Sequence, residues 1–369
     1  MEDMTKNDIY DIIIEKVMEE SMISNLSYDR WEIPKYSKSE INNAGKIITE
    51  GSVSIKELEG ALNVLNNWRA SHAYPLHVIA SNLRSSNQNA IVVQRLKRLD
   101  SIIGKLDRFS DMSLYRMQDL GGCRVITDSI DDIYSSLNRY KNSRIRHELK
   151  REYDYMQVPK QSGYRSYHMV YQFHSDTKDT YNKNMLIEIQ FRTKLQHIWA
   201  TAVEMMGLYT RHNLKSSQGS EEVLRFFTLV SSVFAKMEKM PICPNTSDLY
   251  DELVDEIKVI DKKNNITSCL SALSVAINHV NTNMKDKKYQ YYILLLNYGK
   301  MTLRVMPFSA HKLETATKIY SEIESKKKED KTIDVVLVSA SSFDSLRIAY
   351  PNYFVDISEF VDIMRRILA

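Results

Sequence analysis

A nine-residue segment, KQSGYRSYH (160–168), combines cations and aromatic rings in a pattern suited to holding a nucleotide. Stacking on a base while neutralising its phosphates requires an exposed ring beside cationic side chains. If the segment opens a strand, Tyr164 and His168 share a face that we expect to line a cleft. Lys160 and Arg165 would then contact phosphates. The alternative is that Tyr164 only packs in the core, the commoner role of a tyrosine at a strand start.

Residue parity in MLIEIQFRT (185–193) places polar side chains together on one face of a strand. Side chains alternate between the two faces of a strand, so residues two apart share a face. One face would be apolar, formed by Ile187, Ile189 and Phe191. The other would carry a carboxylate, an amide and a guanidinium, from Glu188, Gln190 and Arg192. The pattern predicts the floor of a polar cleft, although a strand with a merely wet outer face would alternate in the same way.

Cations cluster in and after IVVQRLKR (91–98). Arg95 and Lys97 would share a strand face, and Lys105 lies in the helix that follows, with Ser101 as its expected cap. Two strand cations and one near a helix start would suit a polyphosphate, because the N-terminus of a helix adds partial positive charge. The alternative is an ordinary solvated surface, where lysine and arginine are common.

A carboxylate precedes a glycine pair in MQDLGGCRVI (117–126). Asp119 stands at the entrance of a predicted strand, where glycines allow a ligand to approach the backbone and a carboxylate could hold Mg²⁺. The alternative is an ordinary turn aspartate. Asp119 and Arg124 are an odd number of residues apart, so a regular strand would send their side chains to opposite faces.

These residues depend on a sheet and helices to bring them together. Between about 90 and 245, segments with strand periodicity alternate with helical segments, which predicts an α/β domain around one central sheet. The first 60 residues or so predict short helices. The expected strands are 91–98, 121–127, 164–173 and 185–191, and the expected helices include 101–109, 129–140 and 194–210.

The chain changes character after the two prolines of KMPICPNTSD (239–248), the best candidate for a linker. Beyond it we expect a helical connector (246–286) and a small α+β module (287–369) that opens with a hairpin over 291–308. The predicted organisation is a helical extension (1–60), an α/β domain (61–245) and a C-terminal domain (246–369).

Composition and cysteine placement exclude several classes of protein. The chain of 369 residues is 43% hydrophobic and 26% charged, with a formal net charge of +3, which is ordinary for a soluble globular protein. Cys123, Cys243 and Cys269 lie far apart, so we expect neither a zinc site nor a disulfide framework. No apolar run approaches the roughly 20 residues of a membrane-spanning helix. The acidic N-terminus is unlike a signal peptide, and we expect a cytoplasmic protein.

Four segments in this order resemble the synthetase domain of the RelA/SpoT homologues: RLKRLDSIIGKL, MQDLGGCRVI, KQSGYRSYH and IEIQFRTKLQHIWA. The resemblance covers about residues 60–240. It implies a nucleotidyltransferase-like fold and transfer of pyrophosphate from ATP to a ribose hydroxyl, with release of AMP. Long members of this family also carry an N-terminal hydrolase domain. We expect none here, because only about 60 residues precede the match and they lack a His–Asp dyad.

The resemblance also implies a role for each matching residue. Asp119 would bind Mg²⁺, and Glu188 would help to hold the metal and activate the attacking hydroxyl. ATP would be held by Arg95, Lys97, Lys105 and Arg124, with Arg124 packing on the adenine. The acceptor would be held by Lys160, Tyr164, Arg165, His168 and Arg192, with Tyr164 stacking on its base. A metal, a carboxylate and a ring of cations agree with this chemistry, which depends on positioning and charge stabilisation.

The acceptor is the open question within this family, where alarmone-making small synthetases use GDP or GTP and a toxic branch modifies the 3′ end of tRNA. A basic segment, RYKNSRIRHELKR (139–151), would suit RNA phosphates, although it could equally be a solvated helix end. Its candidate RNA-binding residues are Lys141, Arg144, Arg146, Lys150 and Arg151.

The C-terminal module resembles that of the CapRel-type fused toxin–antitoxins. In that group a pseudo-zinc-finger domain blocks the active site through a Y-x-x-Y motif and is released by a phage capsid protein. Tyr350 and Tyr353 have this spacing, and we expect one of them near Tyr164 in the inactive enzyme. The prediction is a tRNA pyrophosphokinase of phage defence that its own C-terminal domain inhibits. The alternatives are a (p)ppGpp synthetase acting on GDP or GTP and a non-catalytic RNA-binding module.

Overall fold

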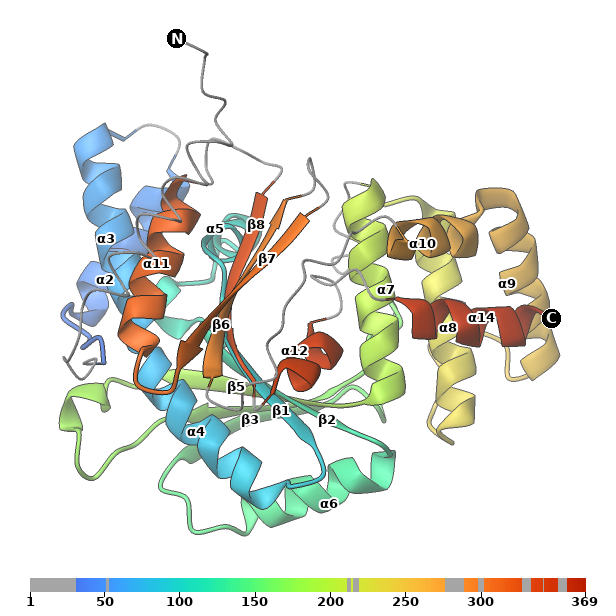
Figure 1. Cartoon of the computed structure of the whole chain (residues 1–369), viewed down its shortest axis with the longest axis horizontal. Coiled ribbons are helices and arrows are strands. Elements are labelled where there is room, and N and C mark those ends of the chain that lie inside the picture. Colours follow the sequence, from blue (N-terminus) through green and yellow to red (C-terminus); the bar gives the residue numbers. More distant parts are fainter. Residues whose placement is uncertain are drawn as a thin grey trace.

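The computed structural model describes residues 31–50, 53–210, 214, 219–275, 289–297, 302–326, 333–340, 342–350 and 357–369 of the chain. In these ranges, helices cover both faces of one eight-stranded sheet (Figure 1). The prediction of an α/β fold with a mixed sheet flanked by helices is confirmed. No helix of the described ranges is long and apolar enough to cross a membrane.

The sheet combines strands from both halves of the chain. Its strands are β1 Ile91–Leu96, β2 Gly121–Thr127, β3 Glu148–Asp154, β4 Tyr167–Gln172, β5 Leu186–Thr193, β6 Tyr289–Asn297, β7 Thr302–Ser309 and β8 Ile333–Ser339. Their order across the sheet is β3-β4-β5-β2-β1-β8-β6-β7. β2 and β5 are parallel, and the other neighbouring pairs are antiparallel. The hairpin predicted over 291–308 is confirmed as β6 and β7.

Serine side chains cap several of the helices, and one predicted cap is wrong. The longer ones are α2 Lys38–Thr49, α3 Ile55–Ser71, α4 Ala73–Ser86, α5 Leu99–Arg108, α6 Ile130–Lys141, α7 Lys194–Thr210, α8 Glu221–Met237, α9 Tyr250–Asn264, α10 Ile266–Val275, α11 Leu313–Lys326, α12 Phe343–Ala349 and α14 Ser358–Leu368. Ser37 and Ser54 form capping boxes at α2 and α3. The prediction that Ser101 caps α5 is wrong. The helix begins at Leu99, whose amide donates to the Glu324 carboxylate at 2.8 Å.

Two hydrophobic cores lie on opposite faces of the sheet. The first packs α2 to α6 and α11 against one face and includes Trp68, Leu76 and Tyr320. The second packs α7 to α10, α12 and α14 against the other face and includes Phe226 and Phe360. Each core contains side chains from before and after the predicted domain boundary at residue 245. The C-terminal part is therefore joined to the rest of the chain by continuous apolar packing.

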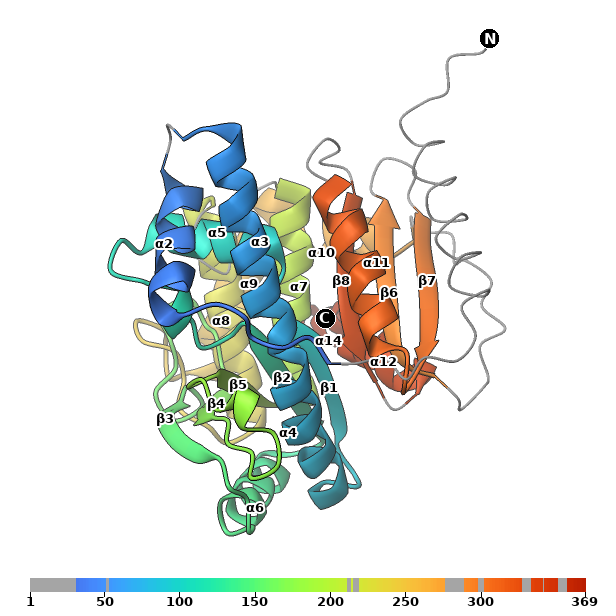
Figure 2. The same cartoon turned by 90° about the vertical axis from the view of Figure 1, so that its left-hand side faces the viewer.

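The C-terminal strands extend the sheet directly from β1. β8 pairs with β1 through Gln94–Ser339 and Arg95–Val338, and Figure 2 shows β6, β7 and β8 with α11 along one side of the molecule. The stretch predicted as a linker, 239–248, packs on α8, where the amide of the buried Cys243 donates to Ser232. The division into domains at residues 60 and 245 stays a prediction, as does the likeness to a pseudo-zinc-finger.

A buried ion pair also joins the two parts of the chain. The Arg69 guanidinium on α3 lies 2.5 Å from the Glu324 carboxylate on α11, and the two side chains are only 3% and 5% exposed. Glu324 also accepts from the Tyr320 hydroxyl at 2.8 Å, besides the Leu99 amide. Arg98 pairs with Asp334 on β8 beside this cluster. The turn between β1 and α5 is thus held by side chains of the C-terminal part.

Candidate functional site

The register of the strands brings the predicted polar side chains to one face of the sheet. Glu188 on β5 lies opposite Gly122 on β2, and Gly122 lies opposite Arg95 on β1. The next row across the sheet is formed by Arg124, Gln190 and His168. The opposite face of β5 is fully buried, through Ile187, Ile189 and Phe191. The two faces predicted from the alternation of β5 are therefore confirmed.

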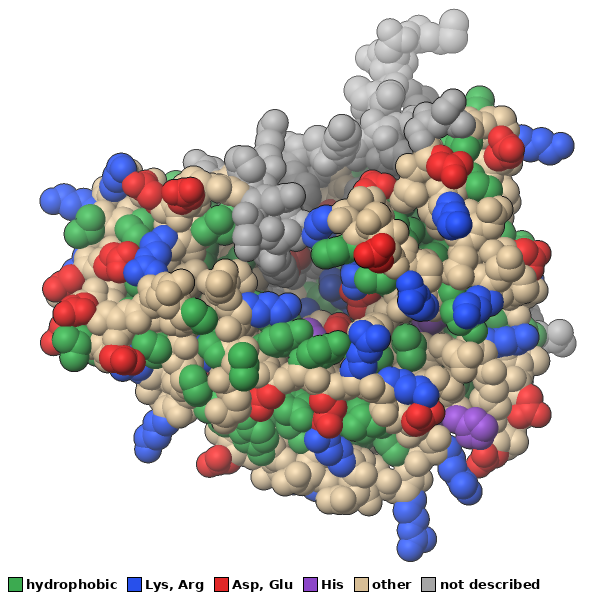
Figure 3. All heavy atoms as spheres, turned by 180° about the vertical axis from the view of Figure 1, so that it is seen from behind, with side chains coloured by type: hydrophobic (Ala, Val, Ile, Leu, Met, Phe, Trp, Pro, Cys, Tyr) green, Lys and Arg blue, Asp and Glu red, His purple; other side chains and the backbone are tan. Residues whose placement is uncertain are grey.

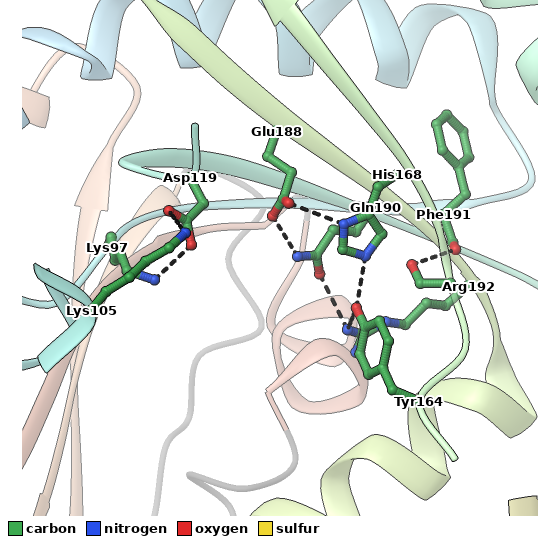
Figure 4. Close-up of polar contacts among 10 residues, drawn as sticks. Lys97, Lys105, Asp119, Tyr164, His168, Glu188, Gln190, Phe191 and Arg192 are labelled. Carbon is green, nitrogen blue, oxygen red and sulfur yellow. Dashed lines mark hydrogen bonds and ion pairs between the residues drawn. The ribbon is translucent and has the colours of Figure 1, made fainter. Parts of the chain in front are cut away.

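A closed ring of hydrogen bonds through five side chains lies on this polar face (Figure 4). His168 Nδ1 is 3.0 Å from Glu188 Oε1, and His168 Nε2 is 2.8 Å from the Tyr164 hydroxyl. Arg192 Nη2 donates to the Tyr164 hydroxyl at 2.6 Å and to Gln190 Oε1 at 3.3 Å. Gln190 Nε2 closes the ring by donating to Glu188 Oε2 at 2.6 Å. Both carboxylate oxygens of Glu188 are thereby fixed in orientation.

The side chains of the ring are mostly buried, and their charges shift one another's pKa values. Burial alone would lower the pKa of His168, but Tyr164 and the Glu188 carboxylate raise it to about 9. Burial alone would raise the pKa of Tyr164, but the positive charges of Arg192 and His168 lower it to about 7. The pKa of Glu188 is lowered despite burial, mainly by its hydrogen bond with His168. At neutral pH the site therefore holds an ionised carboxylate against an imidazolium.

A second polar cluster lies where β1 and β2 meet the end of α5. Lys97 Nζ contacts Asp119 Oδ2 at 2.7 Å, and Lys105 Nζ contacts Asp119 Oδ1 at 3.0 Å (Figure 4). Burial opposes ionisation of Asp119, but the two ammonium groups outweigh it and lower the pKa of the carboxyl to about 2. Lys105 was expected near the start of its helix, which is wrong. It lies in the last turn of α5, so the helix N-terminus adds no charge beside it.

The conflict of parity between Asp119 and Arg124 disappears in the structure. β2 begins at Gly121, so Asp119 precedes the strand and its side chain does not follow strand alternation. Both side chains line one cavity, together with Gly122. A Cβ on Gly121 would lie 2.7 Å from Ile187, so this glycine allows close packing of β2 on β5. Of the two glycines, Gly122 borders the cavity and Gly121 does not.

Tyr350 from the C-terminal part lines this cavity. The cavity has a volume of about 40 Å³ and is lined by Arg95, Asp119, Gly122, Cys123, Arg124, Glu188, Gln190 and Tyr350. The Tyr350 hydroxyl donates to the Gln94 carbonyl at 3.2 Å, and Arg124 Nη1 donates to the Ala349 carbonyl at 3.0 Å. One of the two C-terminal tyrosines was expected near Tyr164. Tyr350 lies instead on the side of Arg95 and Arg124, and Tyr353 lies outside the described residues.

The residues of the segment 160–168 separate into two groups. Tyr164 and His168 belong to the ring, and the Lys160 ammonium lies 5.4 Å from the centre of the Tyr164 ring. Arg165 is 4% exposed and donates to Ser231 Oγ and the Met156 carbonyl on the inner side. The expectation that Arg165 handles phosphate is therefore wrong, because its guanidinium serves the packing of α8. The strand begins at Tyr167, after this turn, and not at Tyr164.

The predicted basic segment is partly neutralised by acidic neighbours. Lys141 pairs with Glu152, Arg146 with Asp176 at 3.2 Å, and Lys150 with Glu148 at 2.6 Å. Arg144 and Arg151 are exposed. Figure 3 shows basic and acidic side chains mixed on the face behind that of Figure 1. The segment 139–151 therefore offers single cations to a phosphate, and its basic side chains do not form an unbroken basic stripe.

The donor atoms around the cavity suit a hard cation. Asp119 and Glu188 both line it, and Mg²⁺ is commonly bound by one or two carboxylates together with water and substrate phosphates. Each ionised carboxylate keeps acceptor capacity beyond its present partners. In the described part of the chain, no three or more His, Cys, Asp or Glu side chains are grouped so that they could hold a metal ion. The residues fit a cation that arrives with a polyphosphate.

A larger cavity lies away from the predicted site residues. A cavity of about 610 Å³ lies between α3 and α11, and none of the predicted site residues lines it. The chemistry identifies the smaller cavity, since its walls carry the charged side chains whose pKa values are displaced. Sequence reasoning also missed the role of Gln190 as a link in the ring, although parity had already placed it beside Glu188.

Residues 94–213 match the family model described as the region found in RelA / SpoT proteins. The site lies in a RelA/SpoT-like region. GTP pyrophosphokinase YjbM of Bacillus subtilis is 35% identical over 112 residues, which is 30% of this chain and 52% of that protein. GTP pyrophosphokinase YwaC of the same organism is 32% identical over 134 residues, 35% of this chain and 62% of that protein. The chain thus matches little more than half of the length of these relatives.

Solved structures of similar proteins align with the same part of the chain. The small alarmone synthetase 1 of Bacillus subtilis bound to its product pppGpp is 24% identical, with a TM-score of 0.40, over 46% of this chain and 89% of that one. A GTP pyrophosphokinase family protein from Streptococcus pneumoniae is 23% identical, with a TM-score of 0.38, over 51% and 91%. At such TM-scores the likeness adds nothing to the fold, which the chain's own strand order establishes.

Proposed function

We propose that the chain is an ATP pyrophosphotransferase of the RelA/SpoT type, inhibited in this conformation by its own C-terminal part. The observation that carries the proposal is the position of Glu188. It lies in a RelA/SpoT-like region, on the wall of a cavity shared with Asp119 and Arg124. Transfer of pyrophosphate to a hydroxyl needs a carboxylate, a second acidic side chain and several cations around one cavity.

On the donor side, the cations around the cavity would bind ATP. Arg95 and Arg124 would contact the nucleotide, and Lys97 and Lys105 would exchange their contacts with Asp119 for the phosphates. Asp119 and Glu188 would hold Mg²⁺, which neutralises phosphate charge when bound. Burial and the nearby Arg192 and Arg95 lower the pKa of Arg124 to about 10, so an anionic ligand is especially favourable beside it.

On the acceptor side, the ring would orient the attacking hydroxyl. The oxygen of this hydroxyl would attack the β-phosphorus of ATP and form a new O–P bond. The bond between the β-phosphorus and the oxygen that bridges the α- and β-phosphates would break, and AMP would leave. The hydroxyl proton passes to Glu188, whose two oxygens are fixed by His168 and Gln190. Tyr164, held through its hydroxyl by Arg192 and His168, would offer its ring to the acceptor base.

For the acceptor we propose the 3′ hydroxyl of tRNA, supported by the exposed Arg144 and by the exposed Arg151, which lies on β3 opposite Val170 of β4. GDP or GTP is the second candidate, favoured by the names of the two relatives from Bacillus subtilis. A non-catalytic RNA-binding module is disfavoured, because such a module has no need for Asp119 and Glu188 in one cavity.

Inhibition would come from Tyr350, whose ring fills the space that ATP needs. The end of α12 is held there by contacts from β2 and α7. Arg124 on β2 donates to the Ala349 carbonyl, and His197 Nε2 on α7 lies 2.8 Å from the Ile348 carbonyl. ATP would have to displace these contacts. We propose that a phage capsid protein withdraws α12 by binding the C-terminal part, and that the chain serves in phage defence.

The test uses the full chain, because removal of residues 246–369 would expose both cores. Wild type, Tyr350→Ala and Tyr350→Phe are incubated with Mg²⁺, γ-labelled ATP and either deacylated tRNA or GDP. We expect label on tRNA with Tyr350→Ala, little with wild type, and little with Tyr350→Phe, which keeps the ring in the cavity. Adding Glu188→Gln to Tyr350→Ala should abolish transfer.

Each outcome of this assay decides a separate part of the proposal. Label on GDP alone would overturn the tRNA acceptor and leave pyrophosphate transfer in place. Equal labelling by wild type and Tyr350→Ala would overturn the inhibition. A folded Tyr350→Ala variant that labels neither acceptor would refute the pyrophosphotransferase itself.

A further inference from the structure

We infer that Tyr153 and Tyr155 form a second stacking surface, next to the catalytic ring, for the unpaired bases of an RNA 3′ end. The inference rests on the proposed tRNA acceptor, because a mononucleotide bound at Tyr164 would not need it. Neither tyrosine has a role in the site described so far.

The two rings are arranged in parallel. Their centroids are 5.7 Å apart and their planes differ by 2°. Tyr155 meets His168 edge-on, with centroids 5.2 Å apart, and meets Tyr164 in the same way at 6.0 Å. Aromatic side chains therefore continue without a break from Tyr164 at the catalytic ring to Tyr153 on β3.

The strand register places this surface on the correct face of the sheet. Tyr153 lies opposite His168, in the same row as Gln190 and Arg124. β3 is the last strand at its end of the sheet, so the row runs from the cavity to the sheet edge. An acceptor whose last base lies on Tyr164 could continue along this row, with its preceding bases over Tyr155 and Tyr153.

Burial separates these tyrosines from the ones that only pack. Tyr140 and Tyr171 also meet edge-on, but they are 1% and 2% exposed and belong to the core behind the sheet. Tyr153 and Tyr155 are half-buried, so part of each ring remains accessible to a ligand. Stacking on aromatic side chains tolerates any base and suits a single strand.

Two cations lie beside these rings. The Lys160 ammonium lies over the Tyr155 ring, 4.3 Å from its centre, and could turn to a phosphate when a base binds. Arg151 is exposed and, two residues before Tyr153 on β3, shares its face. Rings and cations side by side are typical of surfaces that bind single-stranded nucleic acid through stacking and phosphate contacts.

The experiment measures how binding depends on RNA length, in the full chain carrying Tyr350→Ala. Fluorescein-labelled RNA oligomers of about one to four nucleotides are titrated and followed by anisotropy, since each added base should find one more ring. We expect affinity to rise with length. Tyr153→Ala should remove the gain from the longer oligomers and raise their Kd about five- to a hundredfold. Tyr153→Phe, which keeps the ring, should bind within about twofold of the parent.

Two further variants separate stacking from charge and from misfolding. Arg151→Gln should reduce the slope of log Kd against log salt by roughly 0.7, whereas Tyr153→Ala should leave the slope unchanged. Tyr153→Leu keeps bulk at the strand and should lose affinity like Tyr153→Ala. Should the alanine variant fail to fold, Tyr153→Leu carries the test.

The outcomes distinguish this inference from the proposed function. The same length dependence in parent, Tyr153→Ala and Tyr153→Leu overturns the stacking surface, even if tRNA is labelled in the transfer assay. Labelling of GDP and not of tRNA overturns the tRNA acceptor. In that case, a length dependence that vanishes in Tyr153→Ala would still show that the surface binds single strands.

Discussion

Replacing Glu324 with glutamine should destabilise the whole chain, including the part that carries the ring of five hydrogen-bonded side chains. Glu324 belongs to the C-terminal part but accepts from Arg69 at 2.5 Å and from the Leu99 amide at 2.8 Å. Both donors lie before the predicted boundary at residue 245, one at the end of α3 and the other at the start of α5. The substitution keeps the shape of the side chain, removes its charge and replaces one acceptor oxygen by an amide NH2 group.

The magnitude follows from burial. Arg69 is 2% exposed, so without the carboxylate its charge would remain in the interior with no opposite charge in contact. Breaking a buried pair by removing one partner costs about 3–5 kcal/mol. Tyr320 and Leu99 would keep an oxygen to donate to, so we expect the lower half of this range. Removing both charges together, in Arg69→Met/Glu324→Leu, should recover most of the loss.

The assay is urea unfolding followed by circular dichroism and by tryptophan fluorescence. Trp68 lies in the first core and Trp199 in the second, so fluorescence samples both sides of the sheet. We expect one shared transition in wild type and in Glu324→Gln, shifted to lower urea in the variant. The double variant should unfold between the two, and its comparison with the single variants Arg69→Met and Glu324→Leu gives a coupling energy for the pair.

Three results would contradict the reasoning. A loss below about 1 kcal/mol in Glu324→Gln would mean that the pair contributes no more than an exposed one. A double variant as unstable as the sum of its single variants would mean that the charges do not interact. Separate transitions for the two cores would contradict the continuous packing across residue 245.

Three shorter predictions concern the site and the turn before β4. Since its folded pKa of about 2 lies below the usual 3.8, Asp119 should add roughly 2 kcal/mol of stability above pH 4 that is lost toward pH 2; the stability difference between wild type and Asp119→Asn should shrink over that range. Arg165→Met should lower stability by about 1–3 kcal/mol, seen as a lower urea midpoint, while KM for ATP, measured in the Tyr350→Ala background, changes little. Gly163→Ala should be strained, because φ is +85° and the new Cβ would lie 2.9 Å from Trp199; an unchanged melting temperature would contradict this.

The sequence by itself determined the polar face of the site. Alternation is local, so the spacing of Glu188, Gln190 and Arg192 was enough to place them on one face of a strand whose other face is buried. The same holds for the class of the fold, since alternating strand and helix periodicity indicates a sheet covered by helices. The position of Asp119 next to Lys97 was not accessible in this way, because it depends on where β2 begins.

Only the tertiary structure decided which of these side chains meet. Arg165 was indistinguishable from a phosphate ligand in the sequence, and it is buried because α8, over 60 residues later, supplies Ser231 as its partner. The contacts of Tyr350 with Gln94 and of Glu324 with Arg69 each join residues about 255 positions apart. Such contacts leave no periodic signal, because they are set by the packing of whole elements. The polar residues of the site were therefore predictable from the sequence, whereas the position of Tyr350 beside them depended on the tertiary structure.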